Sequence, residues 1–202
     1  MRLADARKDQ YRILAKEKGY RSRSAFKLIE INERYNLFFR SNTILDIGCS
    51  PGGWLQVASK YSKRNSKIIG VDINPTEPLN KITILKKSVE DPKLAELLLA
   101  IAGSSFDLFL SDLSPNVSGI WDYDHVRQVS ISSSALELAG KVLGREGIAV
   151  FKIFEGELLH EFKDKLGDIF TKVIVCKPKA SRQESSELYM ISKDLRRDNK
   201  TL

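Results

Sequence analysis

The 202-residue sequence contains little cysteine and little histidine, two residues of each. Cys49 and Cys176 lie far apart and no C-x-x-C pattern occurs, so neither a zinc site nor a disulfide framework is expected. We expect Cys49 to be a small buried thiol, and His125 and His160 to be surface groups. The sequence therefore predicts a protein without a metal site.

Long apolar runs are also missing. No stretch approaches 18 consecutive apolar residues, and residues 1–10 contain no apolar signal region, so no membrane association and a cytoplasmic location are expected. The chain is long enough for one sizeable core, and it has no internal repeat or linker. We therefore predict a single domain with a basic arm (1–20), a catalytic core (21–192) and a polar tail (193–202). A monomer is the default expectation.

Charge is unevenly distributed along the chain, whose formal net charge is +7. Residues 1–40 contain 11 Lys and Arg against 5 Asp and Glu, and residues 172–202 contain 8 against 4. Such basic ends fit a protein that holds a polyanion at one edge, although they could instead only aid solubility. Tyr11, Tyr20 and Phe26 stand among the cations of the first segment, which favours RNA, because unpaired bases stack on aromatic rings.

The central motif is T-I-L-D-I-G-C-S-P-G-G-W, residues 43–54. Its β-branched first half predicts a buried strand over 43–47, and a helical pattern starts at Trp54. The glycines between them, Gly48, Gly52 and Gly53, let the backbone approach a ligand at the carboxyl end of a strand. The spacing is not G-x-G-x-x-G, so the turn is a poor cradle for a pyrophosphate. Asp46, at the strand end, could hold a cationic group or cap the turn.

A second carboxylate follows the next predicted strand. Residues 67–71 form that strand and Asp72 ends it, roughly 20 residues beyond the glycine turn, where an acidic residue commonly binds two ribose hydroxyls. An Asp after an apolar strand can also be only a turn former or a helix cap. Together with the glycine turn, Asp72 indicates an adenosine without phosphates, and we therefore expect S-adenosylmethionine as the cofactor.

Strands and helices alternate along the rest of the chain. Further strands are predicted over 82–85, 106–110, 148–154, 171–176 and 187–191, and helices over 24–35, 54–63, 92–102, 125–143 and 157–166, with Ser24 as a cap and a loop over 113–124. This order predicts an α/β, Rossmann-like fold: a mostly parallel seven-stranded sheet with helices on both faces. Only about ten residues join the last two strands, so the last strand should be antiparallel.

Lys152 is the least expected residue of the sequence. It lies within an apolar strand, where an unpaired ammonium is costly to bury. Either its strand is at an edge, where the ammonium reaches water, or it points into the crevice at the glycine turn. Asp112, at the end of another strand, would face the same crevice.

At this point the sequence resembles the FtsJ/RlmE-type RNA 2′-O-ribose methyltransferases, from Tyr20 to Ile191. The matching segments are 21–31 (R-S-R-S-A-F-K-L-I-E-I), 45–54 (L-D-I-G-C-S-P-G-G-W), 111–119 (S-D-L-S-P-N-V-S-G), 151–156 (F-K-I-F-E-G) and 177–189 (K-P-K-A-S-R-Q-E-S-S-E-L-Y). The resemblance implies a catalytic set of Lys27, Asp112, Lys152 and Glu187. It implies cofactor contacts at Gly52, Trp54, Asp72 and Asp112, and as substrate a uridine ribose of large-subunit ribosomal RNA, in the large ribosomal subunit or its precursor.

Family members often have an aspartate near the adenine amino group, where this sequence has Ser88. Ser88 could accept one hydrogen bond there, or Glu90 or Asp91 could replace it. For catalysis, Lys152 is the candidate base for the 2′-hydroxyl. Lys27, a second cation, would disfavour charge on Lys152, whereas Asp112 and Glu187 would favour charge or orient the amine.

Three alternatives remain at this stage. The same chemistry could act on transfer RNA or on a messenger cap, because the motifs do not determine the target. A nicotinamide-dependent dehydrogenase is disfavoured by the missing G-x-G-x-x-G and by Pro51 within the turn. A non-catalytic ribosome assembly factor is disfavoured by the four catalytic positions.

Overall fold

The computed structural model describes residues 9–182 and 185–196. Its helices are α2 (Gln10–Glu17), α3 (Ser24–Tyr35), α4 (Gly53–Tyr61), α5 (Leu94–Ala102), α6 (Trp121–Val142) and α7 (Leu159–Ile169). Its strands are β1 (Thr43–Ile47), β2 (Lys67–Asp72), β3 (Ile82–Lys86), β4 (Phe106–Ser111), β5 (Leu143–Phe154), β6 (Phe170–Cys176) and β7 (Glu187–Leu195). No helix of the described residues is long and apolar enough to cross a membrane.

The strands form one seven-stranded sheet in the order β3-β2-β1-β4-β5-β7-β6. The first five strands run parallel, and β7 is antiparallel to both β5 and β6. The predicted mostly parallel sheet with an antiparallel last strand is therefore confirmed. β1, which carries the glycine turn at its end, lies inside the sheet between β2 and β4, and all of its residues are buried.

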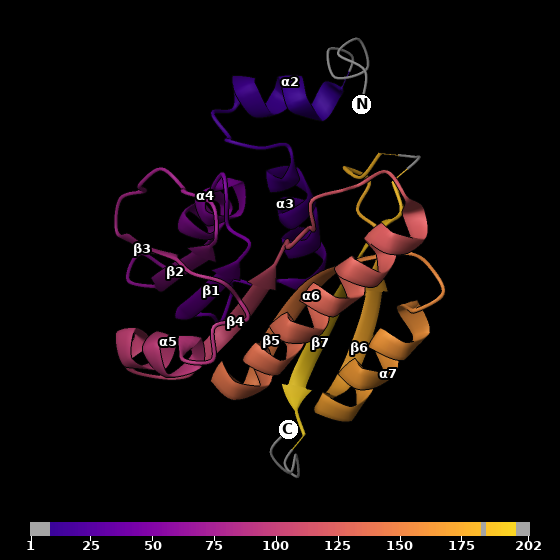
Figure 1. Ribbon diagram of the computed structural model, residues 1–202. Helices are drawn as coiled ribbons and strands as arrows, with labels where there is room; N and C mark the ends of the chain where they lie inside the picture. Colours follow the sequence, from indigo (N-terminus) through magenta and orange to yellow (C-terminus); the bar gives the residue numbers. More distant parts are fainter. Residues whose placement is uncertain (1–8, 183–184, 197–202) are drawn as a thin grey trace.

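Helices cover both faces of the sheet (Figure 1). One apolar cluster joins α5, α6 and α7 to one face, and a second joins α3 and α4 to the other. Alternation along the strands decides which face each side chain contacts: in β5, Phe151 and Ile153 belong to the first cluster and Val150 to the second. The helix α2 lies apart from these layers, beyond the carboxyl ends of the parallel strands (Figure 1).

Several predicted boundaries are wrong by a few residues. α6 begins at Trp121, so the second part of the predicted loop is helical, and β5 begins at Leu143 rather than at residue 148. Ser24 is the first residue of α3 and not its cap, since its hydroxyl hydrogen-bonds to that of Ser22. β7 continues to Leu195, so the first part of the predicted polar tail belongs to the sheet, and residues 197–202 lie outside the described structure.

Within the predicted arm, residues 10–17 form α2, whose Ala15 is buried, and residues 1–8 lie outside the described structure. Cys49 is buried, as expected, and His160 is exposed. The expectation for His125 is wrong, because this histidine is 5% exposed and its Nε2 accepts a hydrogen bond from the Leu158 amide (3.1 Å). Sequence reasoning failed there because four residues before it, at Trp121, α6 has already begun and turns His125 inward.

Candidate active site

The glycine turn connects β1 to α4 at the carboxyl edge of the sheet. Gly48 has φ +76°, and a Cβ at this position would lie 3.0 Å from the backbone nitrogen of Leu113, in the segment that follows β4. Only glycine combines this backbone conformation with such a close approach. The turn therefore brings the ends of β1 and β4 together, which places Asp112 beside the turn.

A cavity of about 420 Å³ opens between the ends of β1, β2 and β4. Four of the predicted cofactor residues line it: Gly48, Asp72, Ser88 and Asp112. Its size lies within the range of small-molecule sites, and it lies outside the carboxyl ends of parallel strands, where ligands of such sheets bind. The sequence did not predict Arg127, Ser130 and Ile131 on the opposite wall. The helix α6, to which they belong, was predicted over these residues, but the sequence does not show that this helix packs beside the cavity.

Asp72 has a structural role in the loops that surround this cavity. One carboxylate oxygen accepts a hydrogen bond from the Ser50 amide (2.9 Å), and the other accepts one from the Asn74 amide (2.7 Å). Asp72 therefore has the turn-forming role that the sequence left open as an alternative. The carboxylate also lines the cavity, and each oxygen retains a further lone pair for a ligand hydroxyl.

Asp46 is fully buried, and neither of its carboxylate oxygens has a hydrogen-bond partner within the described residues. Desolvation, together with the charges of Asp112 and Asp72, raises the pKa of Asp46 well above its usual range. Burial and the nearby Asp46 raise the pKa of Cys49 to about 12, so this cysteine is an unreactive thiol. The strand end therefore has an unsatisfied acceptor group next to the glycine turn, where a ligand cation would satisfy it.

The segment after β3 provides the far wall of the cavity. Both Ser88 and Glu90 line it, and the Ser88 hydroxyl accepts a hydrogen bond from the Glu90 amide (3.2 Å). Asp91 does not line this cavity; it forms an ion pair with Lys87 (2.9 Å) and accepts a hydrogen bond from the Lys93 amide. Of the three residues considered for the adenine edge, the structure places two at the cavity.

Gly52, Gly53 and Trp54 do not line the cavity, although the sequence and the resemblance assigned them to the cofactor. They pack against the segment that leads into α3: a Cβ on Gly53 would lie 2.1 Å from the Ser22 hydroxyl, and the Trp54 indole donates a hydrogen bond to the Ser24 carbonyl (2.9 Å). The second half of the glycine turn thus fixes the start of α3. This contact positions Lys27 relative to the turn.

The four predicted catalytic residues come together on the face of the sheet that α3 covers. In β7, Tyr189 belongs to the apolar cluster of that face, and Glu187, two residues earlier, points the same way. In β5, Lys152 pairs with Tyr189 across the strands, so these two side chains also share a face. Lys27 projects from α3 toward this edge, and its ammonium forms an ion pair with Glu187.

Lys152 is 5% exposed, and it points into the crevice rather than to water. Its ammonium donates a hydrogen bond to the Asp112 carbonyl (2.8 Å) and lies 3.3 Å from the Asp112 carboxylate. The Tyr189 hydroxyl donates to the same carboxylate (3.0 Å), and burial raises the pKa of Tyr189 well above its usual range, so the phenol keeps its proton. The structure therefore excludes the edge-strand alternative for Lys152.

Glu187 is held ionised by its surroundings. Desolvation raises its pKa, but the charges of Lys27 and Lys152, together with hydrogen bonds from Lys27 and Ser185, more than compensate, so that the pKa lies below its usual value. Tyr189 is the residue of this group that sequence reasoning missed. Its position two residues after Glu187, on the same face of a strand, was the available signal.

A second cavity, of about 520 Å³, lies beside these residues. Its lining residues are Arg23, Ser24, Lys27, Asp112, Arg182, Ser185 and Glu187. Asp112 lines both cavities, so the two meet at this side chain. A molecule in one cavity can therefore react with a molecule in the other at a point next to Lys152.

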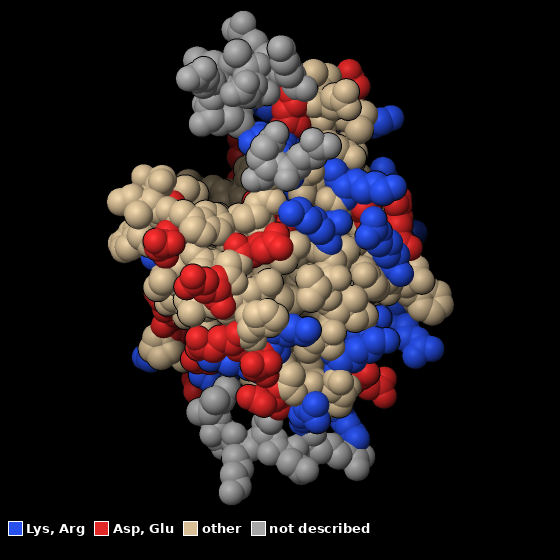
Figure 2. All heavy atoms as spheres, turned by 90° about the vertical axis from the view of Figure 1, so that its right-hand side faces the viewer, with Lys and Arg blue, Asp and Glu red and all other residues tan. Residues whose placement is uncertain are grey.

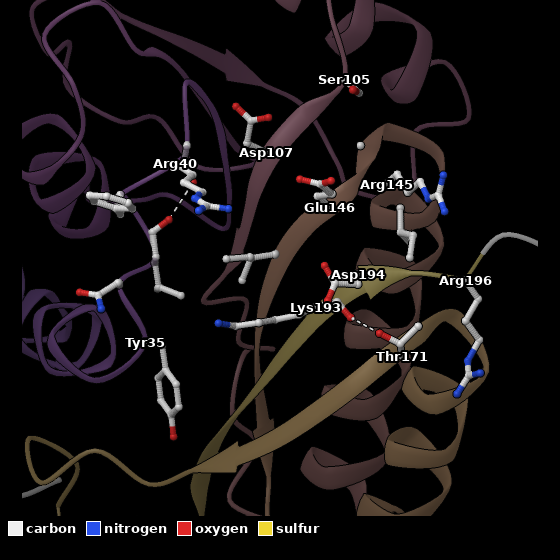
Figure 3. Close-up of a pocket in the computed structure, with 18 residues that line it drawn as sticks. Tyr35, Arg40, Ser105, Asp107, Arg145, Glu146, Thr171, Lys193, Asp194 and Arg196 are labelled. Atoms are coloured by element: carbon white, nitrogen blue, oxygen red, sulfur yellow. Dashed lines mark hydrogen bonds between the residues drawn. The ribbon is translucent and has the colours of Figure 1, made fainter.

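The larger cavity in Figure 3, of about 1480 Å³, lies at the opposite end of the sheet, along the amino ends of β4 and β5. Its charged side chains of both signs, including Arg40, Arg145, Glu146 and Lys193, are spread around an open space and do not converge on a point (Figure 3). One of them, Asp107, accepts hydrogen bonds from the Asn42 and Thr43 amides. A large volume is not by itself evidence of a chemical role, so we assign none to this cavity.

The described residues contain no group of three His, Cys, Asp or Glu side chains that could hold a metal ion. The polar groups of the candidate site are two lysines, their two carboxylate partners and one tyrosine. Such a set can orient a hydroxyl group, accept its proton and hold a cationic ligand near Asp46 and Asp112.

Comparisons with known proteins agree with this geometry. The family model of FtsJ-like methyltransferases matches residues 20–195. Proteins named ribosomal RNA large subunit methyltransferase E from Cenarchaeum symbiosum and Nitrosopumilus maritimus are 45% and 41% identical to this chain over 191 residues, which cover 95% of it and 97% of each relative. A ribosomal RNA methyltransferase of Plasmodium falciparum superposes with a TM-score of 0.78 at 28% identity, over 87% of this chain and 98% of that one.

A more distant solved structure, the MycE methyltransferase in complex with Mg and SAH, shares the fold alone, with a TM-score of 0.59 and 12% identity over 85% of this chain and 47% of that one. Because the family model spans most of the sequence and close relatives align over nearly all of it, this chain belongs to the FtsJ-like methyltransferase family.

Proposed function

We propose that this protein transfers a methyl group from S-adenosylmethionine to a ribose 2′-hydroxyl of large-subunit ribosomal RNA. The observation that carries the proposal is the meeting of two cavities at Asp112, with Lys152 bound to this residue. One cavity holds the methyl donor and the other the target nucleotide. The names of the relatives supply the class of RNA.

The residues of the first cavity fit the methyl donor. S-adenosylmethionine supplies an electrophilic methyl group on a positively charged sulfur. Asp72, which lines the cavity, provides lone pairs for two ribose hydroxyls. Asp46 is fully buried without a partner among the described residues and does not line the cavity, so its contact with a cationic group of the donor is carried over from the sequence. Ser88, which lines the same cavity, is the candidate contact for the adenine edge. Gly52, Gly53 and Trp54 support this site by fixing the turn.

In the proposed reaction Lys152, as the neutral amine, accepts the proton of the 2′-hydroxyl while that oxygen attacks the methyl carbon. The bond between this carbon and the sulfur breaks, the electron pair stays on the sulfur, and S-adenosylhomocysteine leaves as the neutral thioether. Proximity of the two bound reactants supplies much of the rate. The carboxylate of Asp112, held by the Tyr189 hydroxyl, keeps the amine aimed at the junction of the cavities.

The ion pairs change the role that the sequence suggested for Lys27. Its ammonium contacts Glu187, so the charge that was expected to repel a proton from Lys152 is largely balanced. Lys27 acts on Lys152 through Glu187: it neutralises a carboxylate that would otherwise favour the protonated amine. The pair also borders the nucleotide cavity, where it can hold the ribose hydroxyls.

Transfer of labelled methyl groups tests this proposal. The protein should methylate large-subunit ribosomal RNA from a strain that lacks this modification, either as deproteinised RNA or as the assembled subunit. Comparison of the two substrates shows whether the enzyme acts on naked RNA or on the particle. Transfer to transfer RNA or to capped messenger RNA, with none to either ribosomal substrate, would contradict the proposed target.

A further inference from the structure

Two arginines of the nucleotide cavity are occupied by a carboxylate from the N-terminal segment. Asp9 forms ion pairs with Arg23 and with Arg182, whose guanidinium donates hydrogen bonds of 2.8 and 3.2 Å to the same carboxylate oxygen. The Asp9 side chain is 6% exposed, whereas that of Arg182 is 43% exposed. One oxygen anion is therefore held between two guanidinium groups at the edge of the cavity.

The cluster of Asp9, Arg23 and Arg182 lies at the cavity that also contains three of the four predicted catalytic residues. Arg23 and Arg182 both line the cavity that also contains Lys27, Asp112 and Glu187. They reach it from separate parts of the chain, one from the segment before α3 and the other from the connection between β6 and β7. Arg23 also donates a hydrogen bond to the Ala180 carbonyl (2.6 Å), which fixes its guanidinium in this place.

The charges around the cavity are not balanced by the protein. Lys27 is paired with Glu187, and Lys152 with Asp112, so these four groups neutralise one another. Two arginines then remain against the single negative charge of Asp9. A site with an excess of guanidinium charge favours an anion, and the planar donors of arginine suit phosphate as well as carboxylate.

We propose that Arg23 and Arg182 form a binding site for a backbone phosphate next to the target ribose, and that Asp9 occupies this site when RNA is absent. The inference rests on the proposed function. The proposal gives α2 a role in RNA binding, because Asp9 is the N-terminal cap of this helix. Its carboxylate accepts the capping hydrogen bond from the Arg12 amide (3.2 Å). When RNA binds, a phosphodiester replaces the carboxylate and α2 moves away from the cavity.

The surroundings of Arg182 support an RNA path that leads away from the cavity. The connection between β6 and β7 also carries the exposed Lys177 and Lys179. Figure 2 shows Lys and Arg side chains gathered mainly over the right-hand half of this face, whereas Asp and Glu side chains gather mainly over the left-hand half. An RNA strand whose phosphate lies between the two arginines can thus continue over a basic surface.

Two variants and a control test the site. Arg182→Gln removes one guanidinium, and Asp9→Asn removes the competing charge but keeps a residue that caps helices. Arg145→Gln makes the same charge change in the cavity at the opposite end of the sheet (Figure 3) and serves as the control. Binding of each protein to an in vitro transcript of large-subunit ribosomal RNA is measured as a function of salt concentration.

We expect Arg182→Gln to weaken RNA binding about tenfold, as for a lost charge-assisted hydrogen bond, and to reduce the salt slope by about 1, relative to the control. Asp9→Asn should tighten RNA binding by about two- to fivefold, the range for removal of a partly exposed ion pair. In the double variant most of this gain should disappear, because one of the two freed arginines is absent and only Arg23 remains. A gain in affinity cannot result from misfolding.

An Arg182→Gln protein with the affinity and salt slope of Arg145→Gln would overturn the inference, as would an Asp9→Asn protein that binds RNA more weakly than the parent. Failure of the proposed function has a different signature: the parent protein then methylates neither the transcript nor the assembled large subunit. If the parent methylates RNA but Arg182→Gln leaves the KM for RNA unchanged, only the phosphate site is wrong.

Discussion

Replacing Lys152 by methionine removes the proposed base and preserves most of the side-chain volume. The residue is 5% exposed, and among the described residues its ammonium contacts only the carbonyl and the carboxylate of Asp112, so the side chain of methionine fits the same space. A positioned general base contributes about 10²- to 10⁴-fold to a rate. We therefore expect the single-turnover rate of methyl transfer to fall at least about 100-fold. Binding of S-adenosylmethionine should persist, because Lys152 does not line the cofactor cavity.

The pH dependence of the rate identifies the base more sharply. If the step requires the neutral amine of Lys152, the parent rate should rise with pH over the range in which most of this amine is protonated. Lys152→Met should abolish this rise. Lys27→Met leaves the charge of Glu187 uncompensated, which favours the protonated amine and moves the rising limb to higher pH. The double variant Lys27→Met with Glu187→Gln should move the limb back.

Single-turnover rates at saturating RNA, measured over a range of pH values, provide the test, and calorimetry of cofactor binding provides the control for folding. A Lys152→Met protein with a near-normal rate would refute the reasoning. So would a Lys152→Met protein that retains the pH dependence of the parent.

Asp72→Ala should weaken S-adenosylmethionine binding at least about tenfold in calorimetry, because it removes two charge-assisted hydrogen bonds; an unchanged affinity would contradict the assignment. Ser88→Asp should tighten this binding by roughly 1 kcal/mol relative to an analogue without the adenine amino group, and equal changes for both ligands would show that residue 88 does not read that group. The raised pKa of Asp46 means that the native protein holds a proton that the unfolded chain has lost, so stability falls as pH rises above the usual value of 3.8. Asp46→Asn should therefore raise Tm more at about pH 8 than at about pH 4, while weakening cofactor binding; equal shifts in Tm would contradict it. Tyr189→Phe leaves the Asp112 carboxylate with one donor fewer and should lower the single-turnover rate more than it changes cofactor affinity; an unchanged rate would exclude a positioning role.

The sequence predicted the sheet well because its strands carry strong local signals. Short apolar runs marked the strands, three of which (β1, β2 and β4) end at or next to Asp or Gly, and the short connection before β7 required an antiparallel neighbour. The sequence order of the strands contains no equivalent signal for their order in the sheet. That β7 inserts between β5 and β6 depends on pairing between distant segments, and this insertion is what brings Glu187 to Lys27.

The sequence identified most residues of the candidate site, but not the contacts between them. Lys152 could be singled out because a lysine in an apolar strand is costly without a partner, but the partner itself became visible only in three dimensions. Tyr189 escaped notice because a tyrosine in a strand is ordinary. The role of Asp9 escaped notice for another reason: its two arginine partners lie 14 and 173 residues away along the chain.

The central claim is that the methyl group is transferred to a ribose oxygen. A 2′-O-methyl group blocks alkaline cleavage of the following phosphodiester, because the neighbouring hydroxyl is no longer available for attack. Large-subunit ribosomal RNA labelled by this protein with radioactive S-adenosylmethionine and hydrolysed in alkali should therefore yield its label in a resistant dinucleotide. Label recovered in mononucleotides, as expected for a methylated base, would contradict the account.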